Sequence, residues 1–167
     1  MIDQYIKQYG KRLYGLCITL CATTFDADDL YQETWLKVVK NIDRYDPTKS
    51  FEPWLTTICV NTYRNKLRWI ARSPIINRFS AFEEKAAVDA LSVRQKEQEC
   101  DYTSLYKAID NLPDKLRMTV ILFYFRDMDI ASTAQVLGIP VGTVKSRLNK
   151  SRKLLKEALS HETDIRF

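Results

Sequence analysis

The stretch from residue 129 to residue 155 limits most strongly what this chain can fold into. Apolar residues recur at helical spacing on both sides of a short break: Ile130, Ala134 and Leu137 before it, and Val144, Leu148, Leu154 and Leu155 after it. In the break, Gly138 can adopt the left-handed conformation that ends a helix, and Pro140 has its φ preset for the start of the next one. The stretch therefore predicts two helices joined by a tight turn, a helix-turn-helix.

The second of these helices, from Val141 to Lys156, is strongly basic. It contains no acidic residue and carries Lys145, Arg147, Lys150, Arg152, Lys153 and Lys156. The second helix of a helix-turn-helix lies in the major groove of duplex DNA, and this charge density favours a polyanionic partner. The alternative is a solvated basic helix on a small helical core. We expect this helix to bind duplex DNA.

Charge is unevenly distributed along the 167 residues, which suffice for one ordinary domain or two small ones. The total of 26 Lys+Arg against 21 Asp+Glu gives a net charge of +5, which favours an anionic partner. Segment 53–82 contains basic residues and no acid, whereas segment 26–33 is acidic. Two basic segments and one acidic segment indicate more than one kind of partner.

Cysteine and histidine usage predicts no metal site and no cofactor. The sequence has neither a CxxC motif nor a convincing Cys/His pair, and His161 is the only histidine. Cys17 and Cys21 lie four residues apart on one helical face, where we expect them to pack in a core. No apolar run reaches the length of a membrane span and no signal-peptide pattern is present, so we predict a cytoplasmic protein.

The whole chain has helical periodicity and no competing strand pattern. We expect helices over residues 2–21, from an N-cap at Asp26 to before Asp46-Pro47, over 51–72, from 102 to 112, and from Pro113 to Phe125. Ile6 belongs to the expected buried face of the first helix. The predicted fold class is all-α, with two small helical domains at 1–72 and 101–160. A linker at 73–100 joins them and could form a short helix at 83–91.

Two polar surfaces stand out on the N-terminal domain. The outer face of the second helix shows Asp28, Asp29, Gln32 and Glu33; the helix dipole accounts for part of this acidity, but a polar cluster beside an apolar edge suits docking. The second half of the third helix interleaves amide, basic and aromatic residues from Asn61 to Trp69, a mixture that fits single-stranded or melted nucleic acid. The alternative is an ordinary helix end with Trp69 as a packing anchor.

Four segments taken in order, DADDLYQETWLKVVKNIDRYDP, SFEPWLTTICVNTYRNKLR, LYKAIDNLPDKLRMTVILFYF and GIPVGTVKSRLNKSRKLL, resemble the successive regions of a bacterial extracytoplasmic-function sigma factor. The resemblance covers nearly the whole chain except the linker. It implies a promoter-specificity subunit of RNA polymerase, with an N-terminal region 2 that reads and helps melt the −10 element and a C-terminal region 4 that reads the −35 element. The partners it implies are core RNA polymerase, promoter DNA and an anti-sigma factor.

The resemblance also implies roles for individual residues. Asp29, Gln32 and Glu33 fall where the family docks on the clamp helices of the largest catalytic polymerase subunit. Asn61 falls where a flipped −10 base is captured, with Arg64, Lys66 and Arg68 holding the adjacent strand. The residues expected to face the −35 element or its phosphates are Thr143, Lys145, Ser146, Arg147, Lys150 and Arg152.

The sequence departs from the family pattern at three positions. Thr133 stands where the family usually has an aliphatic residue, so we expect the first helix of the turn motif to pack less firmly. Lys145 and Lys150 replace arginines, and a lysine cannot make the bidentate contact to guanine. The base sequence that this helix prefers in the −35 element therefore does not follow from the resemblance.

Two other classes of function compete with the sigma factor, which would itself be no enzyme. A stand-alone helix-turn-helix regulator would bind duplex DNA tightly without polymerase. A nucleic-acid enzyme would need paired carboxylates around a metal, for which Asp28, Asp29 and Glu33 are the candidates. Adjacent Asp28 and Asp29 point to different helix faces and no phosphate-binding glycine loop accompanies them, which disfavours the enzyme.

Overall fold

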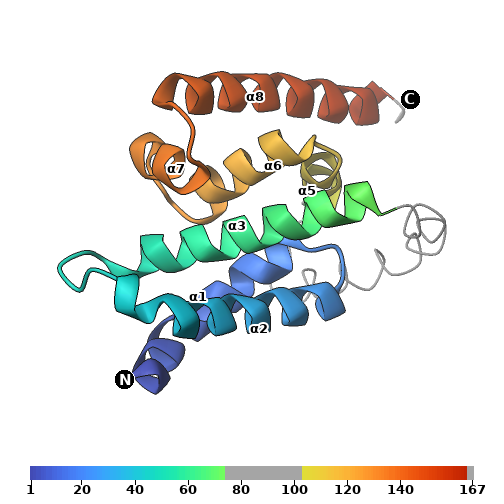
Figure 1. Cartoon of the computed structure of the whole chain (residues 1–167). Coiled ribbons are helices and arrows are strands. Elements are labelled where there is room, and N and C mark those ends of the chain that lie inside the picture. Colours follow the sequence, from blue (N-terminus) through green and yellow to red (C-terminus); the bar gives the residue numbers. More distant parts are fainter. Residues whose placement is uncertain (74–102, 165–167) are drawn as a thin grey trace. The chain divides into compact units, whose positions relative to one another are not determined.

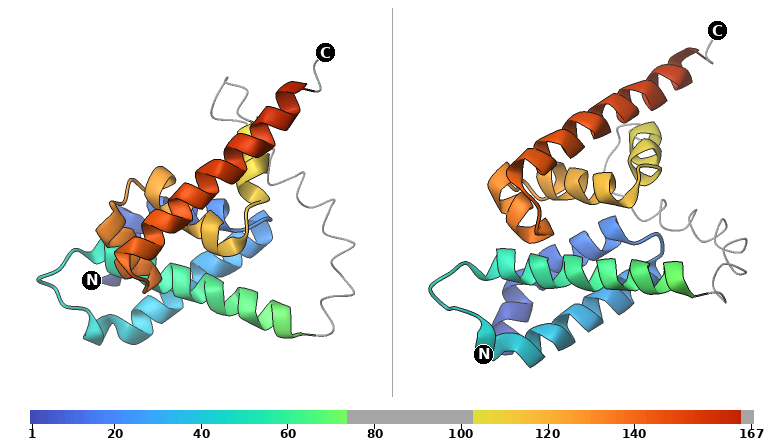
Figure 2. Two further views of the ribbon diagram at one scale, coloured as in Figure 1. Left: turned by 90° about the horizontal axis from the view of Figure 1, so that it is seen from above. Right: turned by 45° about the horizontal axis from the view of Figure 1, so that its top comes forward.

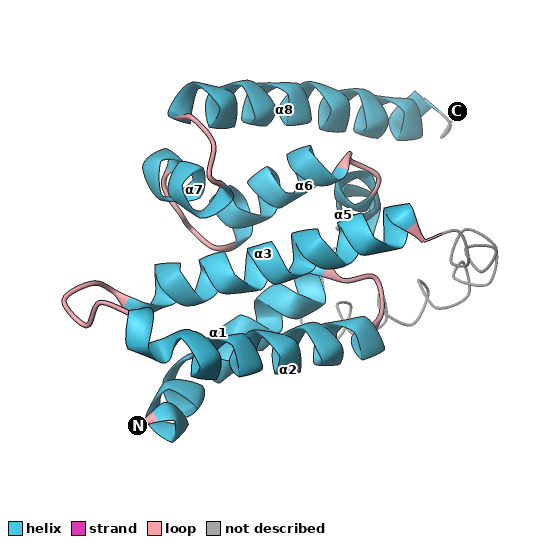
Figure 3. Ribbon diagram, in the orientation of Figure 1, coloured by secondary structure: helices cyan, strands magenta, loops and turns pink. Residues whose placement is uncertain are grey.

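The computed structural model describes residues 1–73 and 103–164. Within these ranges every regular element is a helix, and Figure 3 shows no strand there. The chain divides into two compact units, Met1–Glu97 and Gln98–Phe167. The prediction of an all-α fold with two helical domains is confirmed. The segment 83–91 lies outside the described residues, and the boundaries 1–72, 73–100 and 101–160 remain predictions.

The described residues of the first unit form the helices α1 (Ile2–Leu20), α2 (Thr24–Asn41) and α3 (Phe51–Arg72). A 3-10 turn, η1 (Ile42–Arg44), follows α2. Helix α2 packs against both α1 and α3 and runs antiparallel to α3 (Figures 1 and 2). The antiparallel arrangement brings the first turns of α2 beside the last turns of α3.

The core of this unit forms because large apolar residues recur three or four positions apart on each helix. Its most completely buried members are Leu16, Cys17, Leu20, Ala27, Leu30, Val38, Cys59 and Val60. The prediction that Cys17 and Cys21 pack in a core is confirmed, since both are buried free thiols. Ile6, predicted for the buried face of α1, is instead 37% exposed. Tyr5 turns toward α3 in its place and stacks on Phe51 with 4.1 Å between ring centroids.

The start of α2 corrects the predicted N-cap. The cap is Thr23, whose hydroxyl oxygen accepts a hydrogen bond from the Asp26 backbone N–H at 3.1 Å. The same hydroxyl donates to the Asp26 carboxylate at 2.8 Å. Asp26 is therefore the third helical residue of a reciprocal capping arrangement, and the sequence T-x-x-D carries that signature.

The second unit comprises α5 (Thr103–Asp110), α6 (Asp114–Val120), the π-helix η5 (Ile121–Phe125), α7 (Ile130–Leu137) and α8 (Val141–Asp164). Helix α8 packs against α5, α6 and α7. Among its described residues, one apolar cluster is built on Ile109, Leu112, Leu116 and Val120, and another on Ala134, Val144 and Leu148. The helix predicted from Pro113 to Phe125 is present, but its last five residues widen into the π-helix.

The predicted helix-turn-helix is present at α7 and α8. Gly138 ends α7 in the left-handed conformation with φ of 64°, and the Ile139 N–H donates to the Ala134 carbonyl at 3.1 Å. At the other end of α7, the Asp129 carboxylate accepts a hydrogen bond from the Ser132 N–H at 2.6 Å. Both ends of this short helix are therefore satisfied by specific hydrogen bonds.

Candidate docking and nucleic-acid interfaces

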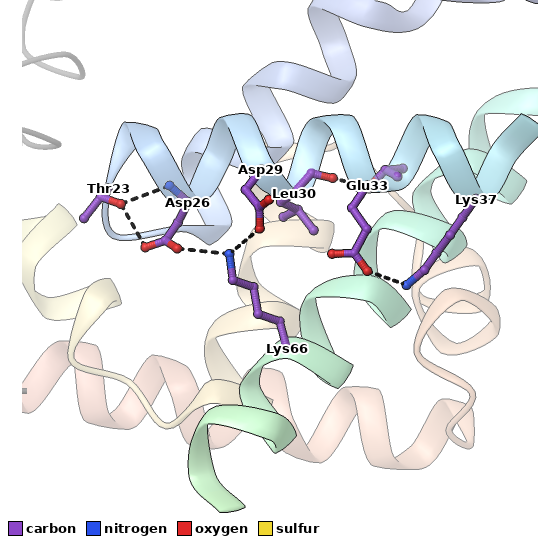
Figure 4. A network of polar contacts seen from close by, with 8 residues as sticks. Thr23, Asp26, Asp29, Leu30, Glu33, Lys37 and Lys66 are labelled. Carbon is purple, nitrogen blue, oxygen red and sulfur yellow. Dashed lines mark hydrogen bonds and ion pairs between the residues drawn. The ribbon is translucent and has the colours of Figure 1, made fainter. Parts of the chain in front are cut away.

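An ammonium group of α3 is held between two carboxylates of α2 (Figure 4). The Lys66 Nζ lies 3.0 Å from Asp26 Oδ1 and 2.9 Å from Asp29 Oδ2. The Lys66 side chain is 22% exposed, whereas Asp29 is 56% exposed. Burial lowers the pKa of Lys66, but hydrogen bonds to Asp29 and Asp26 and their charges more than offset this and raise it above 10.5. Lys66 is thus fully charged at neutral pH.

Two further carboxylates of the acidic face, those of Glu33 and Asp28, also contact neighbouring side chains. Glu33 pairs with Lys37 at 2.9 Å, one helical turn away, and Lys37 Nζ also donates to Thr62 Oγ1 on α3 at 3.1 Å. Asp28 accepts a hydrogen bond from the Tyr14 hydroxyl at 2.8 Å, and this bond is the main cause that raises the pKa of Tyr14. Asp29 and Gln32 are exposed, and Glu33 is half-buried.

Exposed apolar side chains flank the acidic face on α2. Leu36 is 62% exposed and Val39 is 50% exposed, while Phe25 in the first turn is 81% exposed. Phe25 precedes Asp29 by four positions, and Leu36 and Val39 continue from Gln32 at intervals of four and three, so all three extend the same side of the helix. The sequence predicted an apolar edge here without identifying its members. An exposed stripe of carboxylate, amide and aliphatic groups is typical of a protein-docking surface.

The second half of α3 presents the residues expected to bind melted DNA. Asn61 and Arg68 are exposed and Arg64 is half-buried. Trp69 is 64% exposed, so its interpretation as a packing anchor is wrong. Lys66, the remaining basic residue predicted for this surface, turns toward α2 instead, as Figure 4 shows.

The basic side of α8 is open along the predicted recognition helix. Lys145, Ser146 and Lys150 are exposed, and Thr143 and Arg147 are half-buried. The buried positions of the same helix are Val144, Leu148 and Ser151, which face the core of the unit. The helical period therefore separates a basic outer face from an apolar inner one.

One arginine of this face is fixed by neighbouring side chains. Arg152 Nε donates to the Tyr124 hydroxyl at 2.8 Å, and its guanidinium carbon lies 5.9 Å from the centre of the Tyr124 ring. Its Nη1 donates to Asn149 Oδ1 at 3.1 Å. Sequence reasoning missed Tyr124 as part of this surface because the residue lies in the π-helix, outside the helix-turn-helix pattern.

Thr133 places a hydroxyl in the apolar interior behind α7. The residue is completely buried, and its hydroxyl has no hydrogen-bond partner among the residues that the structure describes. A buried hydroxyl without a partner lowers stability relative to an apolar group of the same shape. The expectation that α7 packs less firmly stays a prediction.

Residues 1–73 and 103–164 show neither a metal-binding group nor a membrane-spanning helix. In those ranges no three His, Cys, Asp or Glu side chains gather to form a metal-binding group. None of the helices described there is both long enough and apolar enough to cross a membrane.

Both units match sigma-70 family models. Residues 5–79 match sigma-70 region 2, and residues 102–155 match sigma-70 region 4. The fold and these matches define the chain as an RNA polymerase sigma factor; the stand-alone regulator is not favoured.

Proteins of similar sequence show to which group of sigma factors the chain belongs. The chain is 29% identical over 164 residues to the ECF RNA polymerase sigma factor SigE of Mycolicibacterium smegmatis, covering 95% of this chain and 61% of that protein. It is 26% identical over 161 residues to the ECF RNA polymerase sigma factor SigW of Bacillus subtilis, covering 90% and 84% respectively. The chain belongs to the extracytoplasmic-function (ECF) sigma factors, although it spans less than two thirds of the mycobacterial relative.

Solved structures show the same fold. The sigma factor RpoE of Bartonella quintana, in a complex with the anti-sigma factor NepR, matches with a TM-score of 0.73 and 22% identity over 95% of this chain and 96% of that one. CnrH, in a complex with the cytosolic domain of CnrY, matches with a TM-score of 0.67 and 21% identity over 96% and 88% respectively.

Proposed function

We propose that this ECF sigma factor directs promoter-specific transcription initiation by joining core RNA polymerase to promoter DNA. One observation carries the proposal: the first unit exposes an acidic and apolar stripe on α2 and an amide, basic and aromatic stripe on α3. The first stripe suits a protein partner and the second suits unpaired bases. The protein would be no enzyme, because the core supplies the phosphodiester chemistry, and a cytoplasmic location remains a prediction.

The α2 stripe is the proposed contact with core polymerase. Asp29 and Gln32 are exposed beside Leu36, and Glu33 adds a carboxylate at the edge. A basic partner surface with an apolar centre would complement this stripe in charge and in shape. We expect the apolar residues and the carboxylates both to contribute to the affinity, and the carboxylates also to fix the orientation.

The α3 stripe is the proposed contact with the melted −10 element. Asn61 has a side-chain amide that can both donate to and accept from a base edge, and it is exposed. Arg64 and Arg68 would hold the strand phosphates, and the exposed Trp69 indole offers a stacking surface. Lys66 was predicted for the same strand, but its ammonium is held on the carboxylates of α2.

Helix α8 is the proposed reader of the −35 element. Lys145, Ser146 and Lys150 would face the major groove, with Thr143, Arg147 and Arg152 at bases or phosphates. The Ser146 hydroxyl donates to the Gly142 carbonyl at 3.0 Å, which leaves its oxygen able to accept from DNA. Because lysine ammonium groups lack the bidentate geometry of arginine, we expect this helix to contribute more affinity than sequence discrimination.

A protein inhibitor is the remaining proposed partner. The solved RpoE structure that shares the fold is a complex with an anti-sigma factor. We propose that this chain also has an anti-sigma partner.

Transcription of genomic DNA fragments by core polymerase, with and without this chain, tests the function on every promoter that the fragments contain. Start sites that depend on the chain should share one motif near −10 and another near −35. On a promoter found in this way, Asn61→Ala should reduce open complexes while core binding stays near that of the wild type. Tight duplex binding by the chain alone, with no new start sites, would instead indicate the stand-alone regulator.

A further inference from the structure

Lys66 links the two stripes that the proposed function keeps separate. It lies on α3 among residues expected to bind DNA, yet its ammonium reaches back to α2 and contacts Asp26 and Asp29 (Figure 4). Asp29 is one of the residues proposed to meet core polymerase. Lys66 could therefore serve either the proposed DNA interface on α3 or the proposed polymerase interface on α2, and its contacts decide between the two.

The local charge disfavours a phosphate at Lys66. Two carboxylates surround one ammonium, so the group of three carries a net negative charge. A DNA phosphate would have to displace charge-assisted hydrogen bonds and approach both carboxylates. Exposed Arg68 makes no such carboxylate contact within the described part of the chain; its Nη1 donates to the neutral Asn65 amide oxygen at 3.4 Å.

The same geometry orders Asp29. Lys66 is mostly buried and is anchored by a second carboxylate, Asp26, which the Thr23 hydroxyl fixes in turn at 2.8 Å. The ammonium donates a hydrogen bond to Oδ2 of Asp29. The Asp29 side chain is nevertheless 56% exposed and can accept further hydrogen bonds from a partner. A carboxylate held in one rotamer loses less conformational freedom on binding than a freely rotating one.

We propose that Lys66 is a positioning residue of the polymerase-docking stripe, where it orients the Asp29 carboxylate, and that it is not a contact to promoter DNA. This inference rests on the proposed docking of α2 to core polymerase. It replaces the strand-binding role that the sequence implied for Lys66.

A titration of labelled full-length chain with core RNA polymerase, in the absence of DNA, tests the proposal. Lys66→Gln should weaken core binding by roughly three- to tenfold, because Asp29 loses its fixed rotamer. Lys66→Arg should restore most of the affinity, since its guanidinium can reach the same carboxylates. Lys11→Gln, which removes an equal charge from an exposed position on α1, should bind like the wild type.

A double-mutant cycle and an open-complex assay separate positioning from a purely structural role. In an Asp29→Asn background, Lys66→Gln should cause little further loss of core binding. At saturating concentrations of the variant, Lys66→Gln should open a promoter as fully as the wild type, whereas Arg68→Gln should not.

Three outcomes would overturn the inference. Wild-type core binding by Lys66→Gln together with defective opening at saturation would restore the DNA role. Tighter core binding by Lys66→Gln would mean that Lys66 masks Asp29. An equal loss in the wild-type and Asp29→Asn backgrounds would mean that Lys66 acts through stability alone. A wild-type chain that fails to bind core polymerase would instead contradict the proposed function itself.

Discussion

Lys66 and Asp29, separated by 37 residues in sequence, form an ion pair of 2.9 Å between α3 and α2. The pair exists because the antiparallel helices bring the end of α3 beside the start of α2. Lys37 and Thr62 make a second polar link between the same helices at 3.1 Å. The proposed docking stripe and the proposed strand-binding stripe therefore lie on one pair of helices that polar contacts join side by side.

The glycines of α1 should differ in their response to alanine. A Cβ at Gly10 would lie 2.9 Å from the Tyr31 hydroxyl oxygen, whereas at Gly15 it would meet nothing within 4 Å. Gly15→Ala should raise the free energy of unfolding by about 0.5–1 kcal/mol through helix propensity. Gly10→Ala should gain less, because the Tyr31 side chain has to shift to make room for the Cβ. Urea denaturation of both variants measures the difference, and an equal gain at both sites would contradict the close approach.

The buried Thr133 hydroxyl should be a source of instability in α7. Thr133→Val removes a hydroxyl that has no hydrogen-bond partner among the described residues, so the free energy of unfolding should rise by about 1 kcal/mol. Thr119→Val is the matched control, because Thr119 is equally buried but donates to the Lys115 carbonyl at 2.8 Å. The control should show no gain. If both variants were stabilised alike, helix packing and not the missing partner would be the cause.

Tyr124 should support −35 recognition through Arg152. Tyr124→Phe removes the hydroxyl that accepts from Arg152 Nε, and duplex affinity should fall by roughly two- to fivefold. The slope of log affinity against log salt should stay unchanged, because the charge of Arg152 remains. Arg152→Ala should instead reduce that slope by about one. Fluorescence anisotropy over a range of salt concentrations distinguishes the two, and a slope change in Tyr124→Phe would contradict the positioning role.

Acid should weaken the start of α7. The Ser132 backbone N–H, and secondarily its hydroxyl, holds the pKa of the Asp129 carboxyl below 3.8. Since the folded pKa is depressed, this stabilisation is complete above the unfolded pKa and is lost as pH falls through the folded pKa. The difference in melting temperature between wild type and Asp129→Asn, measured across that range, should shrink with falling pH. A difference independent of pH would show that the carboxylate charge plays no part.

Local sequence signals predicted much of the fold. Gly138 and Pro140 identified the turn of the helix-turn-helix because each imposes a backbone conformation by its own chemistry. The helix 51–72 was bounded correctly for a similar reason: a serine precedes it, Pro53 lies in its first turn, and Ser73-Pro74 ends it. In α2 the cap was misplaced by three residues, because both Thr23 and Asp26 are good caps and only the geometry selects between them.

Contacts between helices could not be read from the sequence. Residue type and spacing identified Lys66 as a basic residue on an exposed stretch, but its partners lie on another helix. The close approach of Gly10 to Tyr31 and the hydrogen bond between Tyr124 and Arg152 likewise depend on helix packing. The sequence therefore identified the candidate residues by their charge or polarity, whereas the structure showed which of them contact one another.

The most direct test of the account is a titration of labelled chain with bacterial core RNA polymerase. Wild type should bind saturably at nanomolar concentrations, and the triple variant with Asp29, Gln32 and Glu33 changed to Ala should lose this binding while keeping its helical circular-dichroism spectrum. A control with Asp3, Gln4 and Gln8 on α1 changed to Ala should bind as the wild type does. Equal binding by the wild type and the triple variant would contradict the docking stripe, and no binding by the wild type would contradict the sigma-factor function.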